Sequence, residues 1–317
     1  MRPFLRDVFL FTAIQVAVYG GLIAAFYRPL PNHYLAATID KHKRLESTKP
    51  PRMIFVGGSG VAFGIHSPAI ADAFPAYRPV NMGLHGSLHL EYMLAEVEPK
   101  VRTGDVVVTV LEYPLLVDQH SQVVDGDFYA ELLVYRPDAI GHYRWPHFKA
   151  LLERGLWRFS HRAFTISLRI MRGKNPDQGH APYTRDSFNA FGDVVAHLEM
   201  EPLDIRARPA FGGATSRAEV EEAVETINEF ARVCRRRGAT VLLGWGPYPE
   251  EQFRQAQTAL RMIESVAREK LTIPVLYRVE DSVYPTDCFF DTAYHLNRRG
   301  GALHTARLIE AIRAALR

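Results

Sequence analysis

The 317-residue chain has few cysteines and little net charge. Its two cysteines, Cys234 and Cys288, lack the spacing of a zinc site, and the sequence leaves open whether they pair or remain free thiols. The formal net charge of +3 is too small to indicate a nucleic-acid partner. Internal repeats and low-complexity tracts are absent from the sequence. With 47% hydrophobic and 23% charged residues, the chain is expected to bury an ordinary globular core.

A long segment without charged residues lies near the N-terminus. Residues 8–26 are nineteen residues without a formal charge, and a helix of that length just reaches across a ~30 Å hydrocarbon core. The short basic segment before it favours a cytoplasmic N-terminus, with the bulk of the chain translocated. We therefore expect residues 1–28 to form a transmembrane anchor and residues 29–51 a tether. A cleaved signal peptide and a buried helix are the alternatives.

After the expected tether, short apolar runs alternate with amphipathic ones. The expected strands are 52–58, 78–83, 105–116, 239–244 and 273–278. The expected helices are 68–74, 87–101, 216–237, 250–271 and 297–316. The helix at 216–237 begins with a capping-box pair, Ser216 and Glu219, and Gly238 is its expected C-cap. This alternation predicts an α/β domain over residues 52–317, with a doubly wound parallel sheet covered on both faces.

Residues 117–215 interrupt the alternation. A segment of that length is too long for a structureless loop, so we expect a largely helical insertion. Its centre, residues 144–174, contains eight Lys and Arg and a single acid, interleaved with Trp, Phe and Leu. Such a segment is expected either to lie on an anionic membrane surface or to cap the rim of an active site.

Two short motifs, far apart in the sequence, supply the groups of nucleophilic acyl chemistry. Met53-Ile-Phe-Val-Gly-Gly-Ser-Gly60 ends an expected strand in a glycine-flanked serine, and Phe289-Phe-Asp-Thr-Ala-Tyr-His-Leu-Asn297 carries a carboxylate and an imidazole. A serine hydroxyl attacks a carbonyl only when a base takes its proton and donors stabilise the oxyanion. The sequence therefore predicts Ser59 as nucleophile, His295 as base and Asp291 as the group that orients the base.

Several other residues are candidates for a binding role. Gly58 and Gly60 let the backbone approach a substrate closely. The residues that end the third and fourth expected strands on the ligand side are candidates for the pocket wall: Glu112, Tyr113, Trp245 and Tyr248. Packing at the root of the insertion is the alternative role for the first two of these.

Two patterns that could indicate a cofactor or a metal are weak. Gly58, Gly60 and Gly64 lack the glycine spacing of a dinucleotide-binding loop, and no acidic residue ends the next strand. His85 and His89 lie four residues apart but have no properly spaced third ligand. We therefore expect neither a cofactor nor a metal.

The order of these blocks resembles the SGNH, or GDSL-like, hydrolase superfamily. Its members carry a serine after the first strand, a glycine after the second, an asparagine after the third, and Asp-x-x-His before the last helix. The resemblance implies a flavodoxin-like sheet, and it implies that the backbone amides of Ser59 and Gly83 hold the oxyanion. This chain departs from the pattern twice. Leu111-Glu-Tyr-Pro114 lacks the asparagine, and the aspartate-to-histidine spacing is one residue longer.

The arrangement is most similar to the membrane-anchored branch of that superfamily, which includes the D-alanyl-lipoteichoic acid biosynthesis and alginate O-acetylation proteins. The resemblance covers residues 50–116 and 216–317. It implies a single-pass protein of the bacterial inner (cytoplasmic) membrane with its main domain in the periplasm. The implied function is O-acyl transfer to a cell-envelope glycan or glycolipid, beside an MBOAT-type membrane acyltransferase. A carbohydrate or lipid esterase, and a non-catalytic accessory protein docking onto the acyltransferase, are the alternatives.

Overall fold

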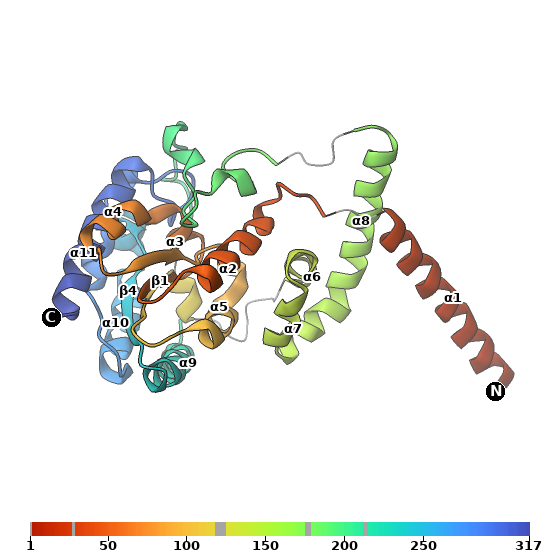
Figure 1. Ribbon diagram of the computed structural model, residues 1–317, viewed down its shortest axis with the longest axis horizontal. Coiled ribbons are helices and arrows are strands. Elements are labelled where there is room, and N and C mark those ends of the chain that lie inside the picture. Colours follow the sequence, from red (N-terminus) through yellow and green to blue (C-terminus); the bar gives the residue numbers. More distant parts are fainter. Residues whose placement is uncertain (1, 27–28, 118–124, 175–178, 212–214) are drawn as a thin grey trace. The chain divides into compact units, whose positions relative to one another are not determined.

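The computed structural model describes residues 2–26, 29–117, 125–174, 179–211 and 215–317 (Figure 1). These residues form two compact units. The larger unit consists of residues 37–123 and 180–317, and the smaller one of residues 1–36 and 124–179. Each unit therefore contains two separate stretches of the sequence.

The larger unit is built on a parallel sheet. Its four strands are β1 (Arg52–Val56), β2 (Arg78–Asn81), β3 (Val106–Leu111) and β4 (Thr240–Trp245). They lie in the order β2-β1-β3-β4, and every neighbouring pair is parallel. All residues of β1 and β3 are buried, as their continuous apolar runs predict for central strands covered on both faces. The predicted α/β class with a parallel sheet is confirmed.

Helices cover both faces of this sheet. They are α2 (Ala37–Ser47), α3 (Ser59–Gly64), α4 (Ser67–Ala73), α5 (His89–Val97), α9 (Arg217–Arg236), α10 (Glu250–Lys270) and α11 (Arg298–Ala315). Helix α11 packs against α3 and α4, whereas α9 packs against α5 and α10. Right-handed crossovers from β1 to β2 and from β3 to β4 run in opposite directions along the sheet, which places these two groups on opposite faces.

The start of α9 confirms a local prediction. The Glu219 N–H donates to Ser216 Oγ at 3.2 Å, and the Ser216 N–H donates to Glu219 Oε2 at 3.0 Å. This is the reciprocal capping box that the sequence predicts. At the other end, Gly238 has a φ of +77°, a conformation that favours glycine after the last helical turn.

The expected fifth strand at residues 273–278 is wrong in extent. Only Val275 forms a parallel bridge, to Leu243 of β4. Pro274 has no backbone N–H, so a continuous ladder cannot run through this segment. Instead the Leu243 N–H donates to Pro274 O at 3.0 Å and the Leu276 N–H to Leu243 O at 2.8 Å. A separate two-stranded parallel pair, β5 (Tyr248–Pro249) and β6 (Val283–Tyr284), follows β4.

Residues of the expected tether are partly helical. Helix α2 begins at Ala37 and packs against β2. Its Lys41 is buried, donates from Nζ to Asn81 O at 3.0 Å and Gly192 O at 2.5 Å, and lies over the Phe188 ring. The amine thus donates to the carbonyl group at the end of β2 and to that of Gly192, and burial lowers the pKa of Lys41 to about 7.

The smaller unit is helical where the structure describes it. Its helices are α1 (Arg2–Phe26), α6 (Gly126–Tyr135), α7 (Trp145–Ala150) and α8 (Leu156–Met171), with a π-helical turn, Leu151–Gly155, between the last two. Helix α8 packs against both α1 and α6. Among the described residues, no helix combines the length and the apolar character needed to cross a membrane. The expected transmembrane helix is therefore not found in the described part of the chain.

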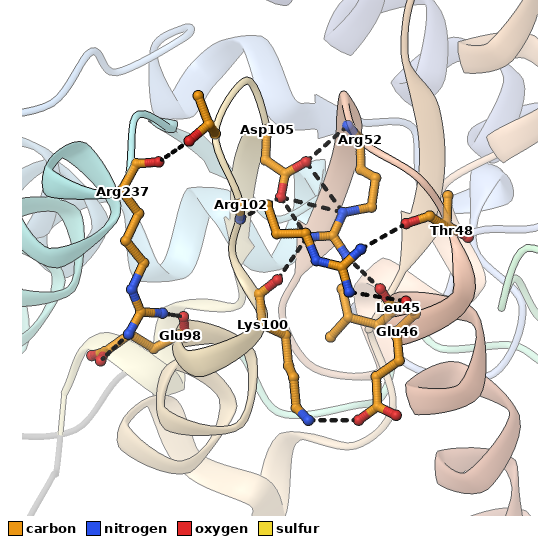
Figure 2. Close-up of polar contacts among 10 residues, drawn as sticks. Leu45, Glu46, Thr48, Arg52, Glu98, Lys100, Arg102, Asp105 and Arg237 are labelled. Atoms are coloured by element: carbon orange, nitrogen blue, oxygen red, sulfur yellow. Dashed lines mark hydrogen bonds and ion pairs between the residues drawn. The ribbon is translucent and has the colours of Figure 1, made fainter.

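A buried ion pair joins the beginnings of β1 and β3 (Figure 2). Arg52 and Asp105 are both shielded from solvent, and Arg52 Nη2 lies 2.5 Å from Asp105 Oδ2. The guanidinium also donates to the backbone carbonyls of Leu45 and Lys100. In turn the carboxylate accepts the backbone N–H groups of Arg52, at 2.9 Å, and Arg102, at 2.8 Å. Helix α2, two strands and the turn before β3 are thus held by one pair of side chains.

We predict that Arg52→Met lowers the free energy of unfolding by about 3–5 kcal/mol, because it leaves a buried carboxylate without its counter-charge. The matched control is Arg102→Met, since Arg102 is exposed and its side chain reaches only backbone carbonyls at the rim. We expect the control to cost less than about 1 kcal/mol. Urea unfolding followed by circular dichroism measures both, and equal losses for the two variants would contradict the assignment.

Candidate active site

Ser59 lies where β1 turns into a short helix. Strand β1 ends at Val56, two glycines follow, and Ser59 is the first residue of α3. An ideal Cβ at Gly57 would lie 2.3 Å from Val110 O, so a side chain there would collide with β3. The turn brings Ser59 to a half-buried position, and its hydroxyl makes no hydrogen bond with any described residue. A reacting group could therefore reach it without displacing an internal partner.

The second motif forms a hydrogen-bonded His–Asp pair. His295 Nδ1 and Asp291 Oδ1 lie 2.7 Å apart, and both side chains are buried. When Nδ1–H donates to the carboxylate, the lone pair of the imidazole is on Nε2, as a general base requires. Burial opposes ionisation of Asp291, but the hydrogen bonds from His295 and Tyr183 and the charge on His295 outweigh it. The pKa of Asp291 consequently lies below its usual value.

Contacts with α3 connect the two motifs. The His295 ring stacks on the ring of Phe63, with the centroids 4.0 Å apart and the planes 8° from parallel. The carbonyl oxygen of Tyr294 lies 3.4 Å from where a Cβ of Gly60 would stand. The structure thus packs the loop that carries His295 against the helix that Ser59 begins.

Tyr183 also contacts the His–Asp pair, and it is not among the residues predicted from the sequence. Its hydroxyl donates to Asp291 Oδ2 and lies 3.3 Å from His295 Nδ1. Burial first, then the hydrogen bond to Asp291 and the charge of that carboxylate, raise the pKa of Tyr183, so the phenol remains a donor. Both oxygens of Asp291 are therefore engaged. Tyr183 belongs to the expected insertion, and no motif in the sequence marks it.

Glu112 lies against the serine turn. It follows β3, is buried, and accepts the Gly60 N–H at Oε1 over 2.5 Å. A Cβ on Gly58 would lie 2.6 Å from Glu112 Oε1, so a side chain there would have to displace the carboxyl group. Burial raises the pKa of Glu112, although the Gly60 hydrogen bond and the charge on His295 act in the opposite direction.

Gly83 is close to the site, but its amide already has an acceptor. The Gly83 N–H donates to Asn81 Oδ1 at 2.9 Å. The amide of the same asparagine donates to Val61 O of α3 at 3.0 Å and to Asp193 Oδ1 at 2.8 Å. Asn81 and Asp193, which are not among the site residues predicted from the sequence, therefore fix the segment after β2 against α3. To hold an oxyanion as expected, the Gly83 N–H would have to give up its hydrogen bond to Asn81 Oδ1.

The three aromatic residues expected to line the pocket are fully buried instead. Tyr113, Trp245 and Tyr248 form a cluster in which Tyr113 stacks on Trp245 at 6.1 Å and meets Tyr248 edge-on at 5.4 Å. The Tyr248 ring in turn lies 5.6 Å from that of Tyr294. The cluster supports the loop before His295 from within the core.

No group of three or more His, Cys, Asp or Glu side chains able to hold a metal ion occurs in the described ranges. The structure thus pairs an imidazole with a carboxylate on the loop packed against α3, and it places a second carboxyl group against the turn that carries Ser59. Comparison with known protein families and with curated protein sequences gives no match to this chain.

We predict that Tyr183→Phe raises the pKa of Asp291 by about one to two pH units, because a hydrogen bond to a charged group contributes roughly 1.5–3 kcal/mol. A carbon-13 NMR titration of the aspartate carboxyl groups measures this shift. The control is Tyr294→Phe, since the Tyr294 hydroxyl is buried and has no hydrogen-bond partner among the described residues. An unchanged Asp291 titration in Tyr183→Phe would show that the phenol does not act on the carboxylate.

Proposed function

We propose that the chain is an SGNH-like O-acyltransferase that acts on a cell-envelope glycan or glycolipid through Ser59, His295 and Asp291. The observation that carries the proposal is the 2.7 Å contact between His295 and Asp291, on a loop stacked against the helix that Ser59 begins. A paired imidazole and carboxylate, together with a serine at the start of the helix they pack against, are the parts of a nucleophilic acyl-transfer site.

The topology supports the same class. The strand order β2-β1-β3-β4 is that of the first four strands of a flavodoxin-like sheet. Ser59 follows β1, Gly83 follows β2, Glu112 follows β3, and His295 precedes the last helix, α11. The first three residues thus lie after the carboxyl ends of strands, where parallel sheets bind their ligands. His295 precedes the last helix, as the superfamily pattern expects.

In the proposed reaction, Ser59 Oγ attacks the carbonyl carbon of an acyl donor and passes its proton to His295 Nε2. Asp291 stabilises the imidazolium through Nδ1–H, and Tyr183 holds the second oxygen of that carboxylate. The tetrahedral intermediate then expels the donor's leaving group, which takes the proton from His295. A sugar hydroxyl attacks the acyl-serine in the second half-reaction, with His295 again as base.

Two alternatives use the same residues differently. In a carbohydrate or lipid esterase, water takes the place of the sugar hydroxyl. A non-catalytic accessory protein that docks onto an MBOAT-type acyltransferase is favoured by one observation: the Gly83 amide is already engaged by Asn81. An oxyanion site with one donor occupied would be weaker than the usual set.

Labelling with a serine-directed fluorophosphonate separates the two enzymes from the accessory protein. We expect a single adduct on the full-length protein, seen by intact mass, and complete loss of it in Ser59→Ala. The matched control is Ser87→Ala, which removes another half-buried serine hydroxyl near the end of β2 and should leave labelling unchanged. If Ser59→Ala restores full function in cells, the nucleophile assignment is wrong.

We further propose that the smaller unit attaches the protein to the bacterial inner membrane, with the larger unit in the periplasm. Helix α1 exposes large apolar side chains, among them Phe4, Phe9 and Phe11, which are 65–71% exposed. Helix α8, which packs against α1, exposes Trp157 and Phe164 beside several arginines. Apolar and basic side chains together suit an anionic membrane surface.

Deleting residues 2–26 should move the protein from the membrane fraction to the supernatant of fractionated bacterial cells, because the deletion removes the exposed apolar side chains of α1. Immunoblotting of the two fractions measures the distribution. A double substitution of Phe9 and Phe11 by Ser should weaken attachment in the same direction. If the full-length protein already remains in the supernatant, attachment through α1 is wrong.

A further inference from the structure

The structure places a carboxyl group where the SGNH pattern expects an amide. Glu112 follows β3, the position of the missing asparagine, and its side chain is 6% exposed. Its Oε1 accepts the N–H of Gly60, the residue directly after the nucleophile of the proposed function. The other oxygen, Oε2, lies 2.7 Å from where a Cβ of Gly58 would stand. The carboxyl group thus lies against both neighbours of Ser59.

The surroundings of Glu112 favour its neutral form. No Lys or Arg side chain forms an ion pair with it in the described part of the chain, and its one described hydrogen bond is to the Gly60 amide. Burial raises its pKa, and this effect outweighs the Gly60 hydrogen bond and the charge on His295. A neutral carboxyl group has one O–H donor, whereas an ionised one only accepts hydrogen bonds.

We propose that Glu112, as a carboxylic acid, donates its O–H to the oxyanion that forms when Ser59 attacks an acyl carbonyl. Since Oε1 accepts from Gly60, Oε2 carries the proton. This inference rests on the proposed function. Glu112 would then replace the side-chain donor of the missing asparagine. The Gly83 amide could keep its hydrogen bond to Asn81.

The electron balance of the step is simple. The Ser59 Oγ–H bond breaks as Oγ bonds to the acyl carbon, and the proton passes to His295 Nε2. The π electrons of the carbonyl move onto its oxygen, which accepts the hydrogen bond from Glu112. When the intermediate collapses, the carbonyl re-forms and the leaving group takes the proton from His295. Glu112 keeps its proton throughout and acts as a donor only.

The ionisation of Glu112 determines how turnover is expected to depend on pH. Below its pKa, Glu112 stabilises the developing oxyanion, and above it the carboxylate repels that oxyanion, so turnover falls on the alkaline side. The other titratable groups around it are His295 and Tyr294 on the adjacent loop, the neighbouring Tyr113, and His85, one residue before Gly86. A Cβ on Gly86 would lie 3.1 Å from Glu112 Oε2, which places that segment beside the carboxyl group.

The test compares Glu112→Gln with Glu112→Leu in the full-length protein in detergent. The probes are p-nitrophenyl acetate turnover over a range of pH, corrected with Ser59→Ala, and fluorophosphonate labelling. A glutamine can accept from Gly60 and donate from its amide at every pH. We therefore expect Glu112→Gln to keep turnover within about threefold of the wild type and to abolish the alkaline decline, while Glu112→Leu loses roughly 100-fold.

Thermal unfolding shows whether the leucine variant folds. If it does not, the glutamine variant alone still tests whether Glu112 acts as a hydrogen-bond donor. The inference is overturned if Glu112→Gln retains the alkaline decline of the wild type, or if it loses turnover as severely as Glu112→Leu. Labelling separates this failure from failure of the proposed function. A wild type that labels at Ser59 while the glutamine arm fails overturns only the role of Glu112. A wild type that does not label overturns the nucleophile, and the inference with it.

Discussion

The buried pair of Arg52 and Asp105 sets the geometry on which the candidate site depends. It joins the first residue of β1 to the residue that precedes β3, and it thereby fixes the register in which Met53 lies beside Val106. Because parallel strands rise together by about 3.3 Å per residue, that register is carried to the other end of the sheet. There the turn after β1 and the residue after β3 meet, and Glu112 receives the Gly60 amide.

This close approach also accounts for the glycines of the serine motif. Gly57 is needed because β3 leaves no room for a Cβ beside the Val110 backbone, and a side chain at Gly58 would have to displace the Glu112 carboxyl group. Steric crowding therefore accounts for Gly57 and favours glycine at position 58, whether or not the turn holds an oxyanion. The glycines cannot by themselves argue for catalysis, whereas the His295–Asp291 pair can, since its geometry suits a base.

Much of the sheet could be predicted from the sequence, because a continuous β-branched run such as that of β3 is typical of a strand buried on both faces. The prediction of a fifth strand was wrong for a local reason: Pro274 has no backbone N–H, and the hydrophobic pattern does not show this. For the candidate site, the sequence predicted Ser59, Asp291 and His295 from their residue types and the glycines around the serine, and the structure pairs the last two. The sequence could not assign Tyr183 or Asp193, since each acts through a contact more than a hundred residues away in the chain.

The expected insertion divides into two parts with different physical roles, and Tyr183 and Asp193 both belong to the second. Residues 124–179 fold with residues 1–36, whereas residues from 180 onward belong to the unit that contains the sheet. The second part supplies Tyr183 to the Asp291 carboxylate, and it supplies Asp193 to an amide network that reaches Gly83. The hydrogen bond between Asn81 and Asp193 is buried and that between Tyr183 and Asp291 is part-buried, so losing either would take a partner from a largely buried polar group. The segment that interrupts the alternation of strands and helices thus contributes residues that hold the candidate site in place. The alternation pattern alone could not predict this role.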